Sequence, residues 1–133
     1  MPFEHHWDTS GVFIVYRGDL VLEEVLASHS RVACDPRFDD LRFVVVDLRF
    51  VERVLLAVND LVEINAFLTG PKLCNPGIYI VVVTESAPAP SAVALYENLP
   101  DRNYDVHICP TMESARKMVA QWRSADGLTG GCP

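Results

Sequence analysis

The sequence has no long hydrophobic run, and basic residues are scarce. The longest uninterrupted apolar stretch is about six residues, whereas a helix that spans a bilayer needs about 20. The 11 Lys and Arg residues are outnumbered by 18 Asp and Glu, giving a formal net charge of −7. Nucleic-acid affinity comes mainly from cations that neutralise phosphates. We therefore expect no transmembrane segment and no nucleic-acid partner.

Cysteine pairs with metal-binding or redox spacing are also missing. Gaps of 40, 35 and 23 residues separate the four cysteines, so no CxxC motif or zinc-type pairing forms. Glycine-rich phosphate loops and a nucleophile-elbow serine are absent as well. The N-terminus "MPFEHHWD" lacks the form of a signal peptide. The sequence predicts free thiols, no cofactor, no metal and a cytoplasmic location. The cysteines are Cys34, Cys74, Cys109 and Cys132.

Half of the 133 residues are hydrophobic, which is typical of a globular chain. A chain of this length forms one domain and buries roughly 65–70% of its unfolded surface without disulfides or metal. The segment "SADGLTGGCP" loses the hydrophobic pattern and gains glycine. We therefore predict a single domain over 1–123 and a flexible tail over 124–133.

Short apolar runs alternate with helical patterns along the chain. The first two runs form an antiparallel hairpin, and the later ones, separated by helices, form a parallel sheet. This order predicts an α/β fold with a mainly parallel five-stranded sheet, one antiparallel edge strand and about four helices. The expected strands are 2–8, 12–18, 43–48, 78–83 and 105–109, and the expected helices start after 19 and cover about 52–68, 92–99 and 111–122.

Single residues mark the expected helix ends. Asp19 stands at an N-cap position, and Thr111 does so for the last helix. Gly70 and Pro71 would stop the helix 52–68.

Three strands carry apolar residues on both faces: "VFIVY", "FVVV" and "IYIVVV". Right-handed crossovers between successive neighbouring strands place the helices on one face of the sheet. The second face then needs a cover, because an exposed apolar area of several hundred Å² usually marks an interface. Either a helix of this chain or a second subunit would supply it.

Asp47 ends the strand 43–48 and is the first candidate for chemistry. Together with Thr84, in "VVVD" and "VVVT", it looks like the phosphoacceptor pair of response-regulator receivers. That chemistry needs an acidic pair for magnesium and a lysine. The first strands offer no adjacent acidic pair, and Cys109 stands where the lysine would be. We therefore interpret Asp47 as an acceptor of hydrogen bonds from nearby backbone amides.

The histidines form no metal-binding set in the sequence. His5 and His6 are adjacent on a strand and point to opposite faces. His107 and Cys109 share a face but lack further ligands. No Ser-His-Asp arrangement follows from spacing either, so we predict a non-enzymatic protein with no catalytic residues.

The segment "LRFVER" directly after Asp47 is the predicted partner-binding surface. Open α/β folds bind partners and ligands beyond the carboxyl ends of their strands, and a strand-to-helix turn here would expose charged residues at that edge. The predicted site comprises Asp47, Leu48, Arg49, Phe50, Glu52 and Arg53.

Several phrases resemble the SpoIIAA-like branch of STAS (anti-sigma-factor antagonist) domains. They are "GVFIVYRGDL", "DPRFDDLRFVVVDLRFV" and the closing "ESARKMVAQW", and the resemblance covers roughly residues 3 to 123. It implies a β-α superhelix, a fold shared with CRAL-TRIO lipid-binding domains. Regulatory members carry a phosphorylatable serine at the start of the helix after the "vvDl" strand. This chain has no Ser or Thr between Arg49 and Asn65, so the resemblance does not imply a phosphorylation switch.

Three functions remain open. The first is a non-catalytic regulatory or protein-interaction module that binds another protein or a second copy of itself. The second is a carrier of a small lipophilic ligand, held in a pocket between the sheet and the helices that contain "LVEINAFL" and "VALYENL". The third is an enzyme, for which the sequence offers no assembled catalytic set.

Overall fold

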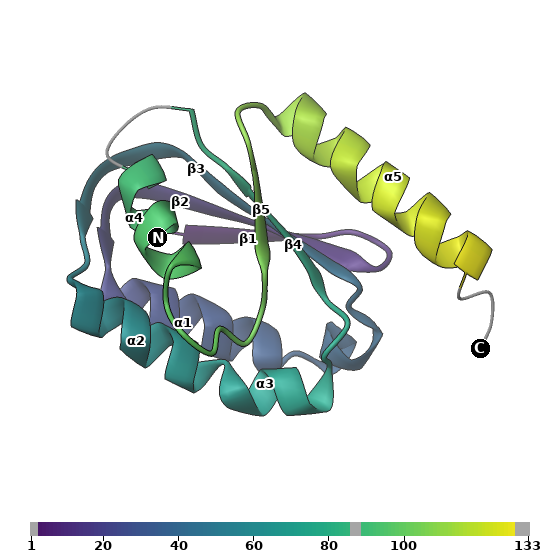
Figure 1. The fold of residues 1–133 in the computed structure, drawn as a ribbon, viewed down its shortest axis with the longest axis horizontal. Helices are drawn as coiled ribbons and strands as arrows, with labels where there is room; N and C mark the ends of the chain where they lie inside the picture. Colours follow the sequence, from purple (N-terminus) through teal and green to yellow (C-terminus); the bar gives the residue numbers. More distant parts are fainter. Residues whose placement is uncertain (1–2, 86–88, 130–133) are drawn as a thin grey trace.

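Five strands form one mixed sheet in the computed structural model, which describes residues 3–85 and 89–129. The strands follow one another across the sheet in chain order, β1-β2-β3-β4-β5. The first pair is antiparallel and the other three pairs are parallel, which confirms the predicted sheet (Figure 1). The strands are β1 (Phe3–Trp7), β2 (Gly11–Val21), β3 (Phe43–Leu55), β4 (Tyr79–Val83) and β5 (Val106–Cys109).

The four predicted helices are present, and the described residues add two short elements. Gly70 and Pro71, expected to stop the second helix, lie instead in the first turn of a six-residue helix, where proline is tolerated. The helices are α1 (Leu22–Ala33), α2 (Val58–Phe67), α3 (Thr69–Cys74), α4 (Ala89–Glu97) and α5 (Met112–Thr129), with a 3₁₀ turn η1 (Pro36–Asp40).

Strand β3 runs well past Asp47, so the predicted helix start near Glu52 is wrong. The pairing with β2 continues until Val21 lies opposite Leu55, and α2 begins only at Val58. Two register shifts in this pairing mark bulges, which bend a strand and increase its twist. Figure 1 shows β3 curving along its length. Long-range pairing therefore overrides the helical spacing of the apolar residues.

Asp19 lies inside β2, so its predicted role as an N-cap is also wrong. Helix α1 starts at Leu22 after an extended Val21, and no side chain caps it. Gly18 adopts φ +69°, a left-handed conformation that glycine accommodates without strain. The Asp19 carboxylate instead accepts two hydrogen bonds from the Arg53 guanidinium, at 2.9 and 2.6 Å.

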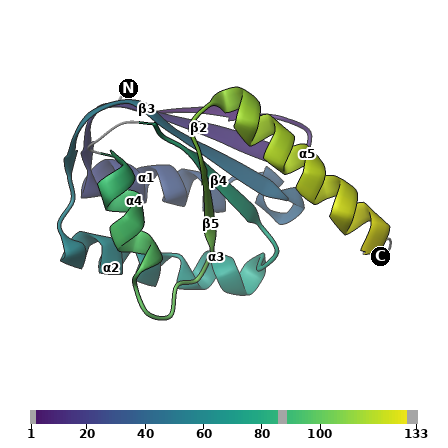
Figure 2. The same ribbon diagram turned by 45° about the horizontal axis from the view of Figure 1, so that its top comes forward.

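The two faces of the sheet bury separate clusters. Helices α1, α2 and α4 cover one face, and α5 covers the other over β3, β4 and β5 (Figures 1 and 2). On the α5 side, Val45, Val81 and Val83 pack against Ala115 and Val119. Burial of this kind stabilises by about 25 cal/mol per Å² of apolar surface. The chain's own last helix therefore covers much of the second face.

Helix α5 begins as predicted and ends later. The Ser114 amide donates to the Thr111 hydroxyl at 3.0 Å, which is the expected N-cap bond. The helix continues to Thr129, seven residues beyond the predicted end at Trp122. The domain limit at 123 and the flexibility of 124–133 stay predictions, and residues 130–133 lie outside the described residues. No helix of the described residues is long and apolar enough to cross a membrane.

Gly11 lies beneath the ring of Phe43, its neighbour on β3. A Cβ atom built at position 11 would stand 2.0 Å from the Phe43 Cζ, and Phe43 is itself buried against Phe13. We expect Gly11→Ala to lower the free energy of unfolding by about 1–3 kcal/mol, because the ring must leave its packed position. Urea denaturation measures this loss.

Gly77 gives the matched control for that substitution. A Cβ there meets no atom within 4 Å, so Gly77→Ala should change the stability by less than about 0.5 kcal/mol. Equal losses in the two variants would contradict the packing argument.

Candidate functional site

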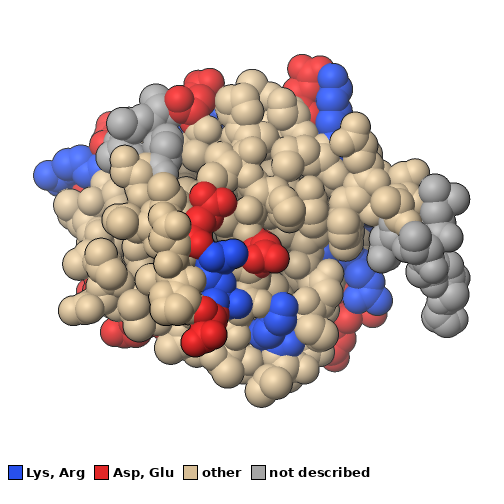
Figure 3. Space-filling model, viewed as in Figure 1, with Lys and Arg blue, Asp and Glu red and all other residues tan. Residues whose placement is uncertain are grey.

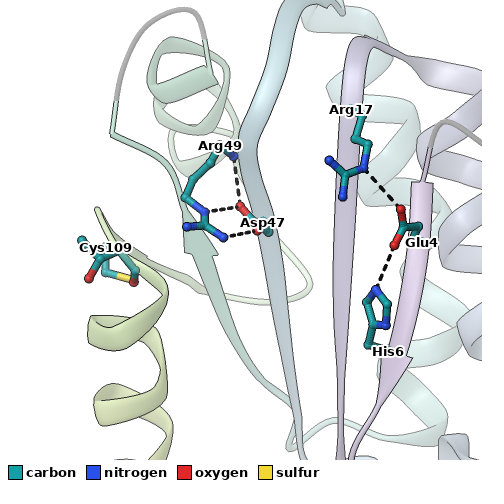
Figure 4. Close-up of polar contacts among 7 residues, drawn as sticks. Glu4, His6, Arg17, Asp47, Arg49 and Cys109 are labelled. Carbon is teal, nitrogen blue, oxygen red and sulfur yellow. Dashed lines mark hydrogen bonds and ion pairs between the residues drawn. The ribbon is translucent and has the colours of Figure 1, made fainter.

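The predicted partner-binding residues lie within strand β3 and not at a strand-to-helix turn. Asp47 and Leu48 are buried, whereas Arg49, Phe50, Glu52 and Arg53 are exposed. The exposed part of the site therefore lies on the strand itself, beside the second half of β2. Figure 4 shows Asp47 and Arg49 on β3, Arg17 on the adjacent β2, and Glu4 and His6 on β1, the next strand beyond β2.

Asp47 is 1% exposed, and Arg49 engages both of its carboxylate oxygens. The Arg49 backbone amide and Nε donate to Oδ1 at 3.0 and 2.9 Å, and Nη2 donates to Oδ2 at 2.8 Å (Figure 4). These hydrogen bonds raise the pKa of the Arg49 guanidinium. The interpretation of Asp47 as an acceptor for a nearby backbone amide is confirmed, and the arginine side chain adds to it.

The phosphoacceptor reading of Asp47 finds no support in this geometry. Thr84 follows β4 as expected, but it is buried and its amide donates to the carbonyl of Cys109. The part of the chain that the structure describes contains no group of three His, Cys, Asp or Glu side chains placed to hold a metal ion. The contacts that the structure shows for the Asp47 carboxylate are those with Arg49, and its architectural role stays a prediction.

Phe50 lies between two arginines on the exposed side of β3. The guanidinium carbons of Arg17 and Arg49 stand 4.8 and 5.1 Å from the centre of its ring, which is cation–π geometry. Phe50 still exposes 45% of its surface. Arg17 also donates to Glu4 at 3.3 Å, and Glu4 accepts from His6 at 3.0 Å. We call Arg17, Arg49, Phe50, Glu52 and Arg53 the β2–β3 surface.

Sequence reasoning missed the exposure of three apolar residues at the end of β3 and in the first turns of α2. Leu55, Val58 and Val62 are each about half exposed. The helical spacing in the sequence grouped them with Leu61 and Leu68 on one side of a helix, and of this group the observed α2 buries Leu61, together with Ile64. Because α2 starts at Val58, two of the three lie in its first turns and the third ends β3.

The structure also brings together His5 and Ser28, which the sequence did not connect. The ring Nε2 lies 2.8 Å from the Ser28 hydroxyl oxygen. Burial lowers the pKa of His5, and the Arg31 charge lowers it further. Ser28 is fully buried, so its hydroxyl cannot reach a substrate. The pair joins β1 to α1 and forms no catalytic site.

A cavity of about 180 Å³ lies between the sheet and helices α1, α2 and α4. The sequence predicted a pocket at this place, and the segments it named contribute to the wall: Leu61, Ile64 and Leu68 from the α2 side, and Val93 and Tyr96 from α4. The presence of the cavity is thus confirmed. That it takes a lipophilic ligand stays a prediction.

Comparison with known proteins finds similarity in structure alone. No protein-family model matches the chain, and no curated protein matches it. The unphosphorylated anti-sigma factor antagonist SpoIIAA covers 90% of this chain and 97% of its own, with 12% identity and a TM-score of 0.56. The phosphorylated form of the Bacillus cell fate determinant SpoIIAA covers 88% and 98%, with 16% identity and a TM-score of 0.53.

A third solved structure with this fold comes from Thermotoga maritima. It is a putative anti-sigma factor antagonist that covers 89% of this chain and 94% of its own, with 15% identity and a TM-score of 0.59. At such identities the likeness shows the fold. The β-α architecture expected from the resemblance to SpoIIAA-like STAS domains is therefore confirmed.

Proposed function

We propose that this chain is a non-catalytic regulatory module that binds a protein partner through the β2–β3 surface. The observation that carries the proposal is Phe50, an exposed aromatic ring between two arginines. Aromatic residues and arginine dominate the binding energy of protein interfaces. Leu55, at the end of β3, and Val58 and Val62 on α2 are also about half exposed.

The fold supports the proposal, because the solved structures that share it are named as anti-sigma factor antagonists. The net charge of −7 favours a protein partner over nucleic acid. On the face drawn in Figure 3, charged side chains of both signs are scattered and the coloured residues form no basic patch. We place the module in the cytoplasm, and its partner is another protein or a second copy of the chain.

The serine switch of the regulatory STAS domains is not part of this proposal. The end of β3 and the first turns of α2 contain no Ser or Thr between Arg49 and Asn65. A switch that adds phosphate charge at this place is therefore unavailable. Partner binding would be set by concentration and affinity.

Phe50→Ser tests the proposal directly. We expect proteins captured by the immobilised wild-type chain, quantified by mass spectrometry, to fall at least about tenfold on the variant, because hot-spot residues contribute 2 kcal/mol or more. If the partner is a second copy, light scattering should show the wild type as a dimer and the variant as a monomer.

Leu73→Ser is the matched control, since Leu73 is 80% exposed on α3, away from the β2–β3 surface. It should keep the same partners as the wild type. Equal capture by both variants, or no specific partner together with a strictly monomeric wild type, would contradict the proposal.

A second candidate function is a carrier of a small lipophilic ligand. The observation that favours it is the cavity between the sheet and helices α1, α2 and α4. Native mass spectrometry of freshly purified protein tests it, because a retained ligand adds its mass to the chain. A bare chain in every preparation would count against a carrier.

A further inference from the structure

We propose that the cavity binds a small, neutral, single-ring molecule that carries one hydrogen-bond acceptor, and that the Tyr16 hydroxyl donates to this acceptor. This inference rests on the second candidate function, which it makes specific. Three features of the cavity carry it: its size, the chemistry of its wall and the absence of charge there.

The size of the cavity sets the size of the ligand. A dry apolar cavity of about 150 Å³ accepts benzene, and pockets for drug-sized ligands measure about 300–1,000 Å³. At about 180 Å³, this cavity takes one ring with a short substituent, on the order of six to nine non-hydrogen atoms.

The wall of the cavity supplies one buried polar group that lacks a partner. Tyr16 lines the cavity and is 2% exposed, and its hydroxyl makes no hydrogen bond within the described residues. Burial raises the pKa of Tyr16, and a hydrogen-bonding contact with the Ser28 side chain partly offsets the rise. This contact does not meet ordinary hydrogen-bond geometry, so the Tyr16 hydroxyl still lacks a well-placed partner. A buried donor without a partner is unfavourable, so a ligand acceptor that reaches it gains affinity.

The wall contains two further tyrosines, Tyr96 and Tyr104. Tyr96 is only half-buried, and the Tyr104 hydroxyl is already engaged. Tyr104 donates to the backbone carbonyl of Asn75 at 2.9 Å. It therefore contributes its ring to the wall, and its hydroxyl is not free for a ligand. Tyr16 is the better donor for a bound molecule.

The charge of the wall selects a neutral ligand. The lining side chains include no Lys, Arg, Asp or Glu in the parts of the chain described. Burial lowers the pKa of His29, the remaining basic group of the wall, to about 4, so that its ring is uncharged at pH 7. Glu24, whose Oε2 is buried without a hydrogen bond, lies close enough to raise the pKa of Tyr16. A ligand carboxylate would thus enter without a cation to pair with.

Three probes of similar size test these points by NMR titration of the full chain at pH 7: benzyl alcohol, toluene and benzoate. We expect benzyl alcohol and toluene to shift the resonances of cavity residues saturably, and benzoate to leave them unchanged up to 10 times the benzyl alcohol Kd. Tyr16→Phe should weaken benzyl alcohol about five- to tenfold and toluene less than twofold, because only the alcohol uses the hydroxyl.

Ala92→Leu fills the cavity from α4, where Ala92 lines the wall, and should weaken both neutral probes at least tenfold. If Ala92→Leu fails to fold, the comparison of benzyl alcohol with toluene on Tyr16→Phe still tests whether the Tyr16 hydroxyl contacts the ligand. Benzoate binding as tightly as benzyl alcohol, or an equal effect of Tyr16→Phe on both neutral probes, would overturn the inference.

The test separates this inference from the carrier function on which it rests. Failure of all three probes, with a retained lipophilic mass in native spectra, overturns the ligand class and leaves the carrier function standing. Failure of the probes together with a bare chain overturns both.

Discussion

Replacing Asp47 with alanine is expected to lower the free energy of unfolding by about 2–4 kcal/mol. The side chain is 2% exposed and accepts three hydrogen bonds from Arg49. Removing it leaves the Arg49 amide without its partner and opens a polar void under β3. The arginine side chain is 33% exposed, so it can turn toward water, which keeps the loss below that of a fully buried pair.

Asp35 offers an unusually close control. It accepts the same three bonds from Arg37, two residues later, at 2.8, 2.9 and 2.9 Å. Its side chain, however, is 19% exposed and it caps the turn η1. Exposed ion pairs contribute little because water screens them. We therefore expect Asp35→Ala to destabilise clearly less than Asp47→Ala.

Guanidinium denaturation of both variants measures the difference. The architectural interpretation of Asp47 requires the larger loss at position 47. A neutral Asp47→Ala would show that the buried carboxylate is not needed for stability, and a chemical role would then have to be considered again.

The sheet could be predicted from the sequence because its strands are short β-branched runs between clear breaks. The runs "FVVV" and "IYIVVV" are too short and too uniformly apolar to form an amphipathic helix, so a strand is the structure that their pattern favours. The sequential strand order then follows from short right-handed connections. Local composition and general chain geometry were sufficient for this part of the fold.

The second half of β3 could not be predicted, because its apolar spacing fits two structures. Leu55, Val58 and Leu61 lie three residues apart and read as one side of a helix. In the structure, Leu55 pairs with Val21, 34 residues earlier in the chain. Such pairing depends on the register of β2 and on its bulges, and no local pattern in "RFVERVLL" reveals it.

The cover of the second sheet face was also beyond the sequence. The predicted helix 111–122 carries Ala115, Met118, Val119 and Trp122 at helical spacing, and these residues do face the sheet. The sequence does not say which face a terminal helix crosses to. The stack of Trp122 on Tyr79, with ring centres 4.9 Å apart, shows how the helix is held over β4.

For the candidate site, the residues could be predicted from the sequence more easily than their exposure and their hydrogen-bond partners. Asp47 was identified by its place at the end of an apolar run, and its hydrogen-bonding role by the lack of reactive neighbours. Phe50 lies in the part of β3 whose pairing with β2 the sequence did not reveal, so its exposure required the structure. The unpartnered hydroxyl of Tyr16 likewise depends on distances that a sequence does not contain.

His29 should make the stability of the protein depend on pH between about 4 and 6.5. Burial is the main cause that lowers its pKa from 6.5 to about 4, and the nearby His5 charge adds to it. In this window the unfolded chain binds a proton at position 29 and the folded chain does not. Stability is therefore fully present above pH 6.5 and is lost as the pH falls toward 4.

The expected loss of stability across that window is about 1–3 kcal/mol, since each unit of pKa difference corresponds to about 1.4 kcal/mol. The lower part of this range applies because His29 is only half-buried, and water screens part of its charge. Urea titrations at pH 7, 5.5 and 4.5 measure it. His29→Gln should remove most of the slope. A smaller part should remain, because burial also lowers the pKa of His5.

His107→Gln is the matched control, because it makes the same substitution at an exposed position on β5 that does not line the cavity. The low pKa of Asp35, about 2, places its own titration below this window. If His29→Gln kept the full wild-type slope, the His29 ring would be free to protonate in the folded chain. A cation would then be available in the cavity wall, and the selection of a neutral ligand there would fail together with the pH prediction.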